Sequence, residues 1–505
     1  MSAYDYVIVG GGSAGCVLAY RLSENPSASV LLLEAGGEDR ADMIDDPTRW
    51  LETIGSRIDW GYETADQADA DGRRIPWPRG KVLGGSSSMN AMVFMRGRRS
   101  DFDSWAMSGN TGWDYDAILP AFQAIESYPA GDPAYRGHAG PLSLTVAATP
   151  NPHSEAALEA ALSVGYPFVE DLNSESAIGV GWNQLSITGG ARCSASSAFL
   201  RPVRDRPNLT VITEARAQRL VLDAHRRVSA VEYLRGGRAE SAGVLAEVIL
   251  AAGAIESPKL LLLSGIGPAD ALAKIGIKPL VSLDGVGENL HDHPGVAITF
   301  TSRRLIPAGR YQGSEIGLFC GSPADPTGPD LQFGILNAAV PGVAQADPGR
   351  SFSFYPSLLK PLSRGRLTLG SPDPAGHPVI DPAYLAAPED ITGLVRAIGI
   401  SRELAAANGL RDWVDAEVAP GPDVDTAEDL RKYVRGNVNT WFHPVGTCRM
   451  GVDDLAVVDP QLRVIGVGNL RVADAAVMPE VTSGNTNAPT LMIAWRAADL
   501  IQASA

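Results

Sequence analysis

The stretch YDYVIVGGGSAGCVLAYRL, residues 4–22, decides the fold. Its first six residues predict a short buried strand, and its last seven predict the start of a helix. Gly10-x-Gly12-x-x-Gly15 stands between them. Gly10 permits the tight turn, Gly12 lets the backbone approach a pyrophosphate, and Gly15 allows the helix to pack closely on the strand.

Glu34 ends the next apolar run, residues 30–33, which is expected to form the neighbouring parallel strand. A carboxylate at this point can accept hydrogen bonds from ribose hydroxyls and would repel a 2′-phosphate. The β–α–β unit therefore predicts dinucleotide binding that disfavours NADP, and a glycine-rich structural turn is the alternative. This motif alone does not separate FAD from NAD.

The composition excludes several classes of protein. The 505 residues are 45% hydrophobic and 20% charged, which is typical of a globular chain. A net charge of −16 argues against nucleic-acid partners and anionic membrane surfaces, because both attract clustered lysine and arginine. No apolar run approaches the roughly 18 residues of a membrane-spanning helix, so no transmembrane segment is expected. The first residues do not predict a signal peptide.

The four cysteines are far apart and fit no metal-binding spacing, so no metal is expected. Reduced thiols in a cytoplasmic protein are the simplest interpretation.

Further elements follow along the chain. Val248–Leu250 and Leu470–Val472 predict strands, and each precedes a helix. Ser257 is expected to cap the first of these helices, with Pro258 as its first residue and Gly265 ending it, and Pro489 is expected to open the second. The middle of the chain predicts antiparallel strands at 330–336, 351–355 and 365–369, and helices at 388–408 and 426–435.

A second glycine loop, Gly84-Gly85-Ser86, offers successive backbone N–H groups without bulky side chains. Such a loop suits the edge of a flat ring, where these donors meet carbonyl oxygens or a ring nitrogen. Asn90 follows it and is a candidate contact to such a ring or to a pyrophosphate. A tight polar turn and a loop-capping asparagine are the structural alternatives.

The wider stretch, residues 80–90, resembles the first signature of the glucose–methanol–choline (GMC) oxidoreductase family, and the match continues through Phe94, Gly97 and Asp103. Residues 253–267 resemble the second signature, and residues 287–293 resemble another element of that family. Residues 443–447 and 483–487 resemble its catalytic segments. The branch indicated is that of choline dehydrogenases and alcohol oxidases, whose members bind FAD and mostly oxidise alcohols.

The resemblance implies an α/β fold. It joins a Rossmann-like FAD-binding domain with a parallel sheet to a substrate-binding domain of antiparallel sheet flanked by helices. Residues 1–150, 191–293 and 445–505 are assigned to the first domain, and residues 151–190 and 294–444 to the second.

The resemblance also implies non-covalent FAD, because Met89 stands where covalently flavinylated relatives can carry a histidine, and a thioether cannot form that link. Asp474 is expected to contact the cofactor partly through main-chain groups, although a helix cap explains it equally well. Asn487 precedes the last helix, whose positive end favours negative charge on a reduced flavin. The full cofactor-binding set is Gly10, Gly12, Ser13, Ala14, Gly15, Glu34, Ala35, Gly84, Gly85, Ser86, Asn90, Ala217, Asp474, Ala475 and Asn487.

Alcohol oxidation needs a hydride acceptor, which the flavin N5 supplies in this family, and a base for the hydroxyl proton. His443 is the candidate catalytic base, because two aromatic residues precede it, Pro444 fixes its backbone, and it matches the family's catalytic histidine. Asn485 matches the second catalytic position. It cannot take a proton, but it can donate a hydrogen bond to a developing alkoxide. A core histidine and a loop asparagine are the alternatives.

The candidate substrate-binding residues are Trp50, Glu315, Trp441 and Phe442. Trp50 and Glu315 fall where choline-oxidising relatives carry a cage tryptophan and an acidic residue, which would suit a cationic alcohol. Glu315 as an exposed carboxylate and Trp50 as a core residue are the alternatives. Phe442 replaces the tyrosine expected in that branch, and Met89 replaces its flavin-linking histidine.

These departures favour a primary aromatic or heteroaromatic alcohol, such as a benzyl, furfuryl or pyridoxine-like methanol, over choline or another amino alcohol. The expected partners are this alcohol and an electron acceptor, either oxygen or a quinone-type carrier. The rival functions are a nicotinamide-dependent dehydrogenase, a lyase on the same flavin scaffold and a non-catalytic flavin protein.

Overall fold

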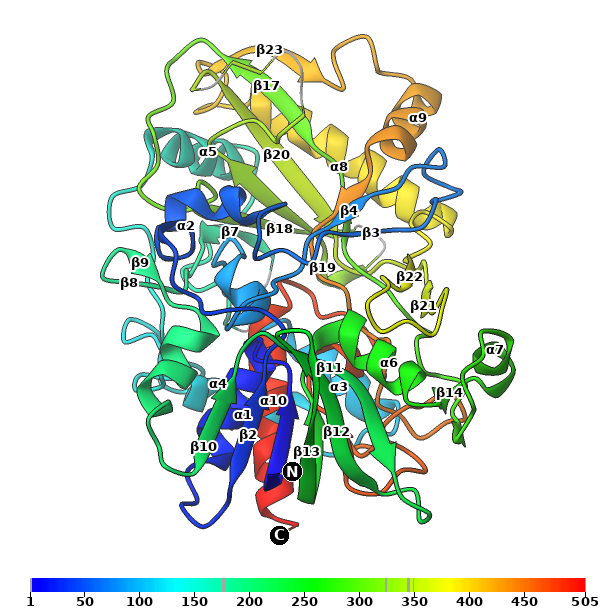
Figure 1. Ribbon diagram of the computed structural model, residues 1–505. Coiled ribbons are helices and arrows are strands. Elements are labelled where there is room, and N and C mark those ends of the chain that lie inside the picture. The colour runs from blue at the N-terminus through cyan, green and yellow to red at the C-terminus, as the bar shows by residue number, and fades with distance from the viewer. Residues whose placement is uncertain (1, 175–177, 323–324, 343–345, 348, 505) are drawn as a thin grey trace.

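The computed structural model describes residues 2–174, 178–322, 325–342, 346–347 and 349–504. Two sheets stand one above the other in Figure 1, and both chain ends lie beside the lower sheet. The lower sheet carries the glycine motif, and the upper sheet is built mainly from the middle of the chain.

The lower sheet has seven strands in the order β10-β2-β1-β13-β12-β11, with β25 paired to β13. The pairs that join β10, β2, β1, β13 and β25 are parallel, whereas β12 and β11 extend the sheet antiparallel. Its strands are β1 (Ala3–Val9), β2 (Val30–Leu33), β10 (Leu209–Ile212), β11 (Ala215–Leu222), β12 (Val228–Arg235), β13 (Arg238–Leu250) and β25 (Leu470–Val472). The predicted β–α–β unit is confirmed, since α1 (Ser13–Leu22) joins the parallel pair β1 and β2.

Helix α6 begins earlier than the sequence predicts. It spans Gly253–Leu263, so Ser257 lies inside it and the expected cap is wrong. The reason is a distant carboxylate: Asp474 Oδ2 accepts hydrogen bonds from the Gly253 N–H at 2.8 Å and from the Ser257 hydroxyl at 2.6 Å. Gly265 follows the helix with φ +79°, as predicted. The last helix, α10 (Asn487–Gln502), likewise begins two residues before Pro489.

The upper sheet has eight strands in the order β23-β17-β20-β19-β18-β7, with β16 paired to β20 and β24. All its pairs are antiparallel, as predicted for the middle of the chain. Its strands are β7 (Gly179–Trp182), β16 (Pro294–Gly295), β17 (Ile298–Ser302), β18 (Ile316–Ser322), β19 (Asp325–Leu336), β20 (Ser351–Leu358), β23 (Val414–Ala419) and β24 (Asn439–Thr440). The accompanying helices are α5 (Pro152–Ser163), α8 (Pro388–Ala406) and α9 (Ala427–Asn437).

The remaining elements are short or lie at the edges. The helices are α2 (Asp42–Asp45), α3 (Arg99–Met107), α4 (Tyr115–Ile125) and α7 (Ala269–Lys274), and the short 3₁₀ or π segments are η1 (Pro47–Thr53), η2 (Gly85–Ser88), η3 (Ser196–Leu200), η4 (Arg201–Val203) and η5 (Ala475–Val477). The short strands are β3 (Tyr62–Glu63), β4 (Pro76–Trp77), β5 (Glu126–Ser127), β6 (Leu142–Ser143), β8 (Ile187–Thr188), β9 (Ala191–Arg192), β14 (Ile266–Gly267), β15 (Val281–Ser282), β21 (Arg366–Thr368) and β22 (Val379–Asp381).

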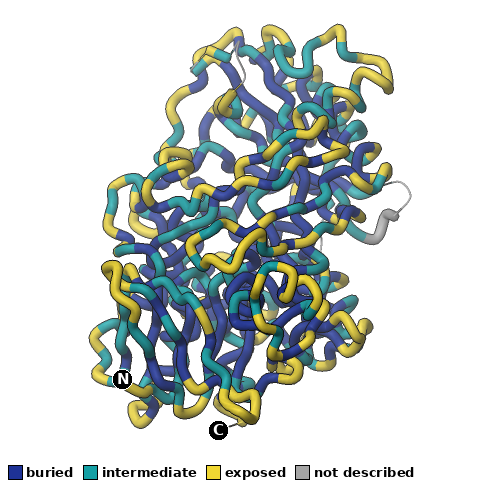
Figure 2. The backbone as a smooth tube through the Cα atoms, turned by 45° about the vertical axis from the view of Figure 1, so that its right-hand side comes forward, coloured by how far each residue is buried: buried dark blue, intermediate teal, exposed yellow. Residues whose placement is uncertain are grey.

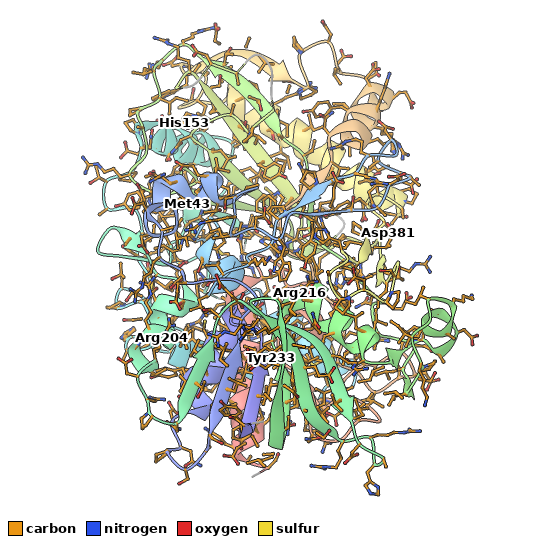
Figure 3. All side chains as sticks on the ribbon, viewed as in Figure 1. Met43, His153, Arg204, Arg216, Tyr233 and Asp381 are labelled. Carbon is orange, nitrogen blue, oxygen red and sulfur yellow. The ribbon has the colours of Figure 1, made fainter. Side chains whose placement is uncertain are left out.

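One apolar cluster runs through both sheets and their helices, from Val7 and Leu32 below to Phe333 and Phe354 above. Figure 2 shows this as buried strand interiors beneath exposed loops. Arg216 lies at the upper end of β11, where the lower sheet approaches the rest of the chain (Figure 3). Within the described residues, no helix is both long and apolar enough to cross a membrane, and the four cysteines are buried and free.

Candidate active site

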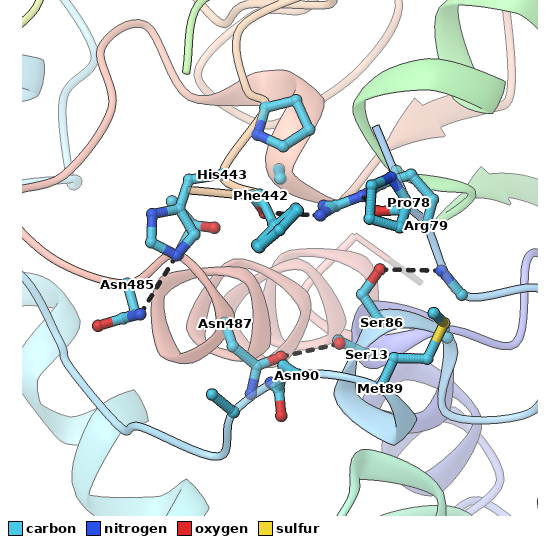
Figure 4. A pocket seen from close by; sticks show the side chains of 18 of the residues that line it. Ser13, Pro78, Arg79, Ser86, Met89, Asn90, Phe442, His443, Asn485 and Asn487 are labelled. Atoms are coloured by element: carbon cyan, nitrogen blue, oxygen red, sulfur yellow. Dashed lines mark hydrogen bonds between the residues drawn. The ribbon is translucent and has the colours of Figure 1, made fainter. Parts of the chain in front are cut away.

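A cavity of about 630 Å³ lies between the two sheets. One end is lined by the first glycine loop, Glu34 and Ala217, and the other by His443 and Asn485 (Figure 4). Segments from residue 9 to residue 490 contribute to its wall, so the site exists only in the folded chain.

The first glycine loop has the geometry that the sequence predicts. Gly10 has φ +102°, and a Cβ there would lie 2.6 Å from the carbonyl oxygen of Ala251. A Cβ on Gly15 would overlap the carbonyl of Gly10, so this glycine lets α1 approach β1 closely. Gly12 lines the cavity, and a Cβ on it would meet nothing nearer than 3.8 Å. The absence of a side chain at Gly12 therefore leaves space for a ligand in the cavity, and does not serve a close contact between backbone segments.

Glu34 is buried at the end of β2. One carboxylate oxygen accepts a hydrogen bond from the Gly11 N–H at 2.7 Å, and the other accepts one from the Gly36 N–H at 2.6 Å. Burial raises the pKa of Glu34 to about 7, and the two N–H groups oppose this rise. Each oxygen keeps a further lone pair for a ligand hydroxyl. Ser13, Ala14, Ala35 and Ala217 line the same end of the cavity.

The second glycine loop lies against the first. A Cβ on Gly85 would lie 2.7 Å from the Cα of Gly12, so a glycine at position 85 lets the two loops approach closely. Gly85 and Ser86 line the cavity. Gly84 has φ +82°, lies outside the lining and shapes the turn.

Asn90 also lines the cavity, with its side-chain oxygen accepting a hydrogen bond from Arg192 at 2.9 Å. The Arg192 guanidinium also donates to the backbone carbonyls of Ile44, Ser87 and Asn90. It therefore fastens this loop from behind. Met89, which precedes Asn90 in the sequence, also lines the cavity (Figure 4).

The C-terminal segments close the nucleotide end. Besides tying down α6, the Asp474 carboxylate accepts a hydrogen bond from the Ala476 N–H at 2.8 Å. Asp474 and Ala475 line the cavity, but the Asp474 carboxylate already accepts hydrogen bonds from Gly253, Ser257 and Ala476. Asn487 accepts a hydrogen bond from the Ser13 hydroxyl at 2.9 Å, which joins the start of α10 to the start of α1.

These features fit FAD. Two glycine loops present bare backbone to one continuous cavity, the N-terminus of α1 opens onto it, and Glu34 offers acceptors at its far end. FAD would be held by the glycine loops, Glu34, Ala217 and the 474–475 and 485–487 segments. When bound it supplies the acceptor for a hydride.

His443 and Asn485, the two candidate catalytic residues, meet at the other end of the cavity. The Asn485 amide nitrogen lies 3.2 Å from His443 Nε2 (Figure 4), and its oxygen accepts a hydrogen bond from Gln332 at 3.0 Å. Because the amide nitrogen carries only hydrogens, it donates and Nε2 accepts. The proton of the neutral His443 ring then belongs on Nδ1.

That Nδ1 lies 2.9 Å from Nδ1 of His293, so it donates to His293 and fixes the tautomer. Burial, together with His293 and Arg79, holds the pKa of His443 well below its usual range. The imidazole is therefore unprotonated at neutral pH, and its Nε2 lone pair accepts a hydrogen bond from Asn485, whose place a substrate hydroxyl would take. This is the state that a proton acceptor needs.

The backbone before His443 is strained and held from both sides. Phe442 has φ +64°, which typically costs about 1–3 kcal/mol for such a residue. Its carbonyl accepts a hydrogen bond from Arg79 at 2.8 Å, and its N–H donates to the Thr440 hydroxyl at 2.7 Å. Asp292 accepts hydrogen bonds from this hydroxyl and from the His443 N–H at 2.7 Å. These contacts fix the direction of the imidazole.

Three of the four expected substrate residues line the cavity: Trp50, Trp441 and Phe442. Trp50 donates a hydrogen bond to the Gln312 carbonyl at 2.9 Å. Glu315 is not among the lining residues, and it is not exposed either. It is 1% exposed, and its carboxylate accepts a hydrogen bond from the Asn151 N–H at 2.7 Å at the start of α5.

Sequence reasoning missed several residues of the site. Asp292 and His293 belong to the 287–293 element already noted, but a motif alone does not indicate their contacts with the segment 150 residues later. Arg79 directly precedes the first family signature, residues 80–90, and could have been considered for this reason. At the nucleotide end, Trp60 and Tyr62 stack at 5.6 Å and line the cavity, and no sequence signal distinguishes them from core aromatics.

Known proteins match the whole chain. Two family models, both described as GMC oxidoreductase, match residues 4–295 and 361–494. Human (Homo sapiens) mitochondrial choline dehydrogenase is 40% identical, over 99% of this chain and 90% of that protein. The alcohol dehydrogenase [acceptor] of Pseudomonas putida is 38% identical, over 99% and 95%. The crystal structure of pyridoxine 4-oxidase from Mesorbium loti superposes with a TM-score of 0.94 at 38% identity, covering 98% of both chains.

The family models cover most of the chain, and the folded site agrees with them at both ends of the cavity. This chain belongs to the GMC oxidoreductase family and is an FAD-dependent alcohol oxidoreductase.

Proposed function

We propose that the protein oxidises a primary aromatic or heteroaromatic alcohol to the aldehyde. One observation carries the proposal: the indole of Trp441 stacks on Tyr355 at 5.4 Å and 16°, and its centroid is 6.1 Å from that of His443. An aromatic surface thus adjoins the base, where a planar substrate can stack.

The chain's own residues handle the proton and the charge. His443 Nε2 accepts the hydroxyl proton, and Asn485 Nδ2 donates a hydrogen bond to the alcohol oxygen as it gains negative charge. A donor of this kind typically contributes roughly 3 kcal/mol. His293 holds the imidazole in the accepting tautomer. FAD held by the two glycine loops would supply the acceptor for the hydride that leaves the alcohol carbon, and oxygen or a quinone-type carrier would be the final electron acceptor.

The charges along the cavity support a neutral substrate. The carboxylates among its described lining residues are Glu34, Glu256 and Asp474, and all three lie on the lower sheet or the elements that follow its strands. The described lining residues that the upper sheet contributes include Gln332, Gly334 and Tyr355, without a carboxylate. A cation near His443 would have aromatic faces but no counter-charge in this part of the wall.

Choline or another amino alcohol is the second candidate. The 40% identity to choline dehydrogenase favours it, and an aromatic face attracts a cation by about 0.5–2 kcal/mol. The relative named pyridoxine 4-oxidase favours the first candidate, because pyridoxine is itself a heteroaromatic methanol.

Anaerobic mixing of the yellow holoenzyme with single alcohols separates the two candidates. Bleaching of the flavin absorbance by benzyl, furfuryl or pyridyl methanols, at rates at least tenfold above choline at equal concentration, is the expected result. Rapid bleaching by choline with the aromatic alcohols inert would contradict the proposal. Product analysis should identify an aldehyde.

A further inference from the structure

Trp441 reaches its place by lying across two glycines. A Cβ on Gly295, in β16, would lie 2.5 Å from the indole Cδ1 and closer still to Nε1. A Cβ on Gly334, in β19, would lie 3.5 Å from the other end of the indole, at Cη2. The indole therefore spans the sheet, and it occupies the volume of a side chain at position 295.

Tyr355 is the third residue of this arrangement, and its strand lies between the strands of the two glycines. Tyr355, in β20, pairs with Gly334, and β20 also pairs with Gly295 through Ser357. The Tyr355 ring stacks on the indole, and its hydroxyl donates to the Thr440 carbonyl at 2.9 Å, one residue before Trp441. Three adjacent strands thus support one flat aromatic surface, which we call the Trp441 shelf: Gly295, Gly334, Tyr355 and Trp441.

Shape rather than hydrogen bonding holds the indole. Among the described residues, its Nε1 is buried without a hydrogen-bond partner, which typically costs about 1–3 kcal/mol. The backbone fixes where the side chain starts, because the Trp441 N–H donates to the His293 carbonyl at 3.0 Å and β24 pairs with β16. An indole that is held only by packing shifts when the space beneath it is filled.

We infer that Gly295 determines substrate shape: by leaving its side-chain volume to the Trp441 indole, it keeps a flat aromatic surface beside His443 that selects planar alcohols. This inference rests on the proposed function and names the residue that sets its specificity. Gly295 acts through Trp441 and is a positioning residue, since it is not itself among the residues that line the cavity.

The test is Gly295→Ala in the holoenzyme, measured as the ratio of kcat/KM for benzyl alcohol to that for n-butanol. The ratio should fall at least tenfold, mainly through a higher KM for benzyl alcohol, because the contact between His443 and Asn485 is untouched. Gly334→Ala should give a smaller fall, because its methyl group would make only an ordinary contact. Gly328→Ala, in open space on the same sheet, is the control for alanine in a strand.

A double-mutant cycle isolates the contact. The added methyl at 295 would also lie 2.8 Å from the Pro356 carbonyl, and this strain is common to both backgrounds. In Trp441→Ala, which removes the shelf, adding Gly295→Ala should therefore leave the ratio within threefold. An unchanged ratio in the single variant, or an equal fall in both backgrounds, would overturn the inference.

The same cycle distinguishes this inference from the proposed function. If the wild-type enzyme prefers choline, the proposed function fails, and the cycle is then run with choline against n-butanol. If Gly295→Ala then lowers stability but leaves this kcat/KM ratio unchanged in both backgrounds, Gly295 has a purely structural role. That result would overturn the inference, whichever substrate the enzyme prefers.

Discussion

His443 shows how four neighbouring side chains make one residue reactive. Asn485 and His293 each contact one ring nitrogen, which leaves a single neutral tautomer consistent with both. Asp292 and Arg79 hold the backbone from which the ring projects. None of these contacts is local in sequence, so the reactivity of His443 is a product of folding.

Met89 decides how the cofactor is retained. Met89 lines the cavity, and a thioether forms no covalent bond to a flavin under ordinary conditions. Acid precipitation of the holoenzyme should release all the yellow colour into the supernatant, where absorbance quantifies it. Flavin retained in the washed pellet would indicate a covalent link through another residue.

Among the structural elements, the glycines of the two loops have different roles, depending on what a side chain at each position would contact. Gly15 serves the contact between α1 and β1, and Gly85 serves the contact between the loops themselves. Gly12 alone faces open space in the cavity. The motif therefore contains one glycine for the ligand and others for the fold.

This division predicts opposite outcomes for two similar substitutions. Gly12→Ala should leave the melting temperature of the apoprotein almost unchanged but weaken FAD binding at least tenfold, because the methyl group enters the cavity. Gly15→Ala should lower the apoprotein melting temperature, because its methyl group would overlap the Gly10 carbonyl and overpacking typically costs about 1–3 kcal/mol. Thermal melts and FAD titrations measure both effects.

Loss of stability in Gly12→Ala with unaltered FAD affinity would contradict the assignment of Gly12 to ligand binding. The two variants serve as controls for each other, since both add one methyl group within the same turn.

At the scale of the whole molecule, sequence reasoning succeeded where the signal was local. The β–α–β unit, the strand at 470–472 and the helix from Pro388 follow from periodicity and turn residues, and the structure confirms them. It failed where a distant group intervened. The Asp474 carboxylate moves the start of α6 away from Ser257, and no feature of the local sequence reveals a partner more than 200 residues away.

The site follows the same rule. His443 and Asn485 were predicted from motifs, and the structure brings them within hydrogen-bonding distance. Glu315 was expected at the substrate, yet it directly precedes β18 and its carboxylate accepts a hydrogen bond from the Asn151 N–H at the start of α5, a partner that lies 164 residues away in sequence. The supporting role of Gly295 was likewise invisible, because it depends on where the indole of a residue in another segment comes to rest.

The folded chain brings residues 292–293, 440–443 and 485–487 together around one imidazole, and the low pKa of His443 follows from that burial. Because burial lowers this pKa, the unprotonated fraction stays high as the pH falls through 6.5. The rate of flavin reduction by alcohol should therefore remain nearly constant from pH 8 to pH 6.5 and decline only at lower pH.

The role of His443 as the base is tested by the anaerobic rate of flavin reduction in His443→Ala, compared with the wild type and with His225→Ala. His225 is an exposed histidine in the loop between β11 and β12. His443→Ala should keep its flavin and its fold but reduce on the order of 10²–10⁴-fold more slowly, the usual range for a positioned base. His225→Ala should match the wild type. Reduction of His443→Ala at the wild-type rate, with flavin fully bound, would contradict the assignment of His443 as the base.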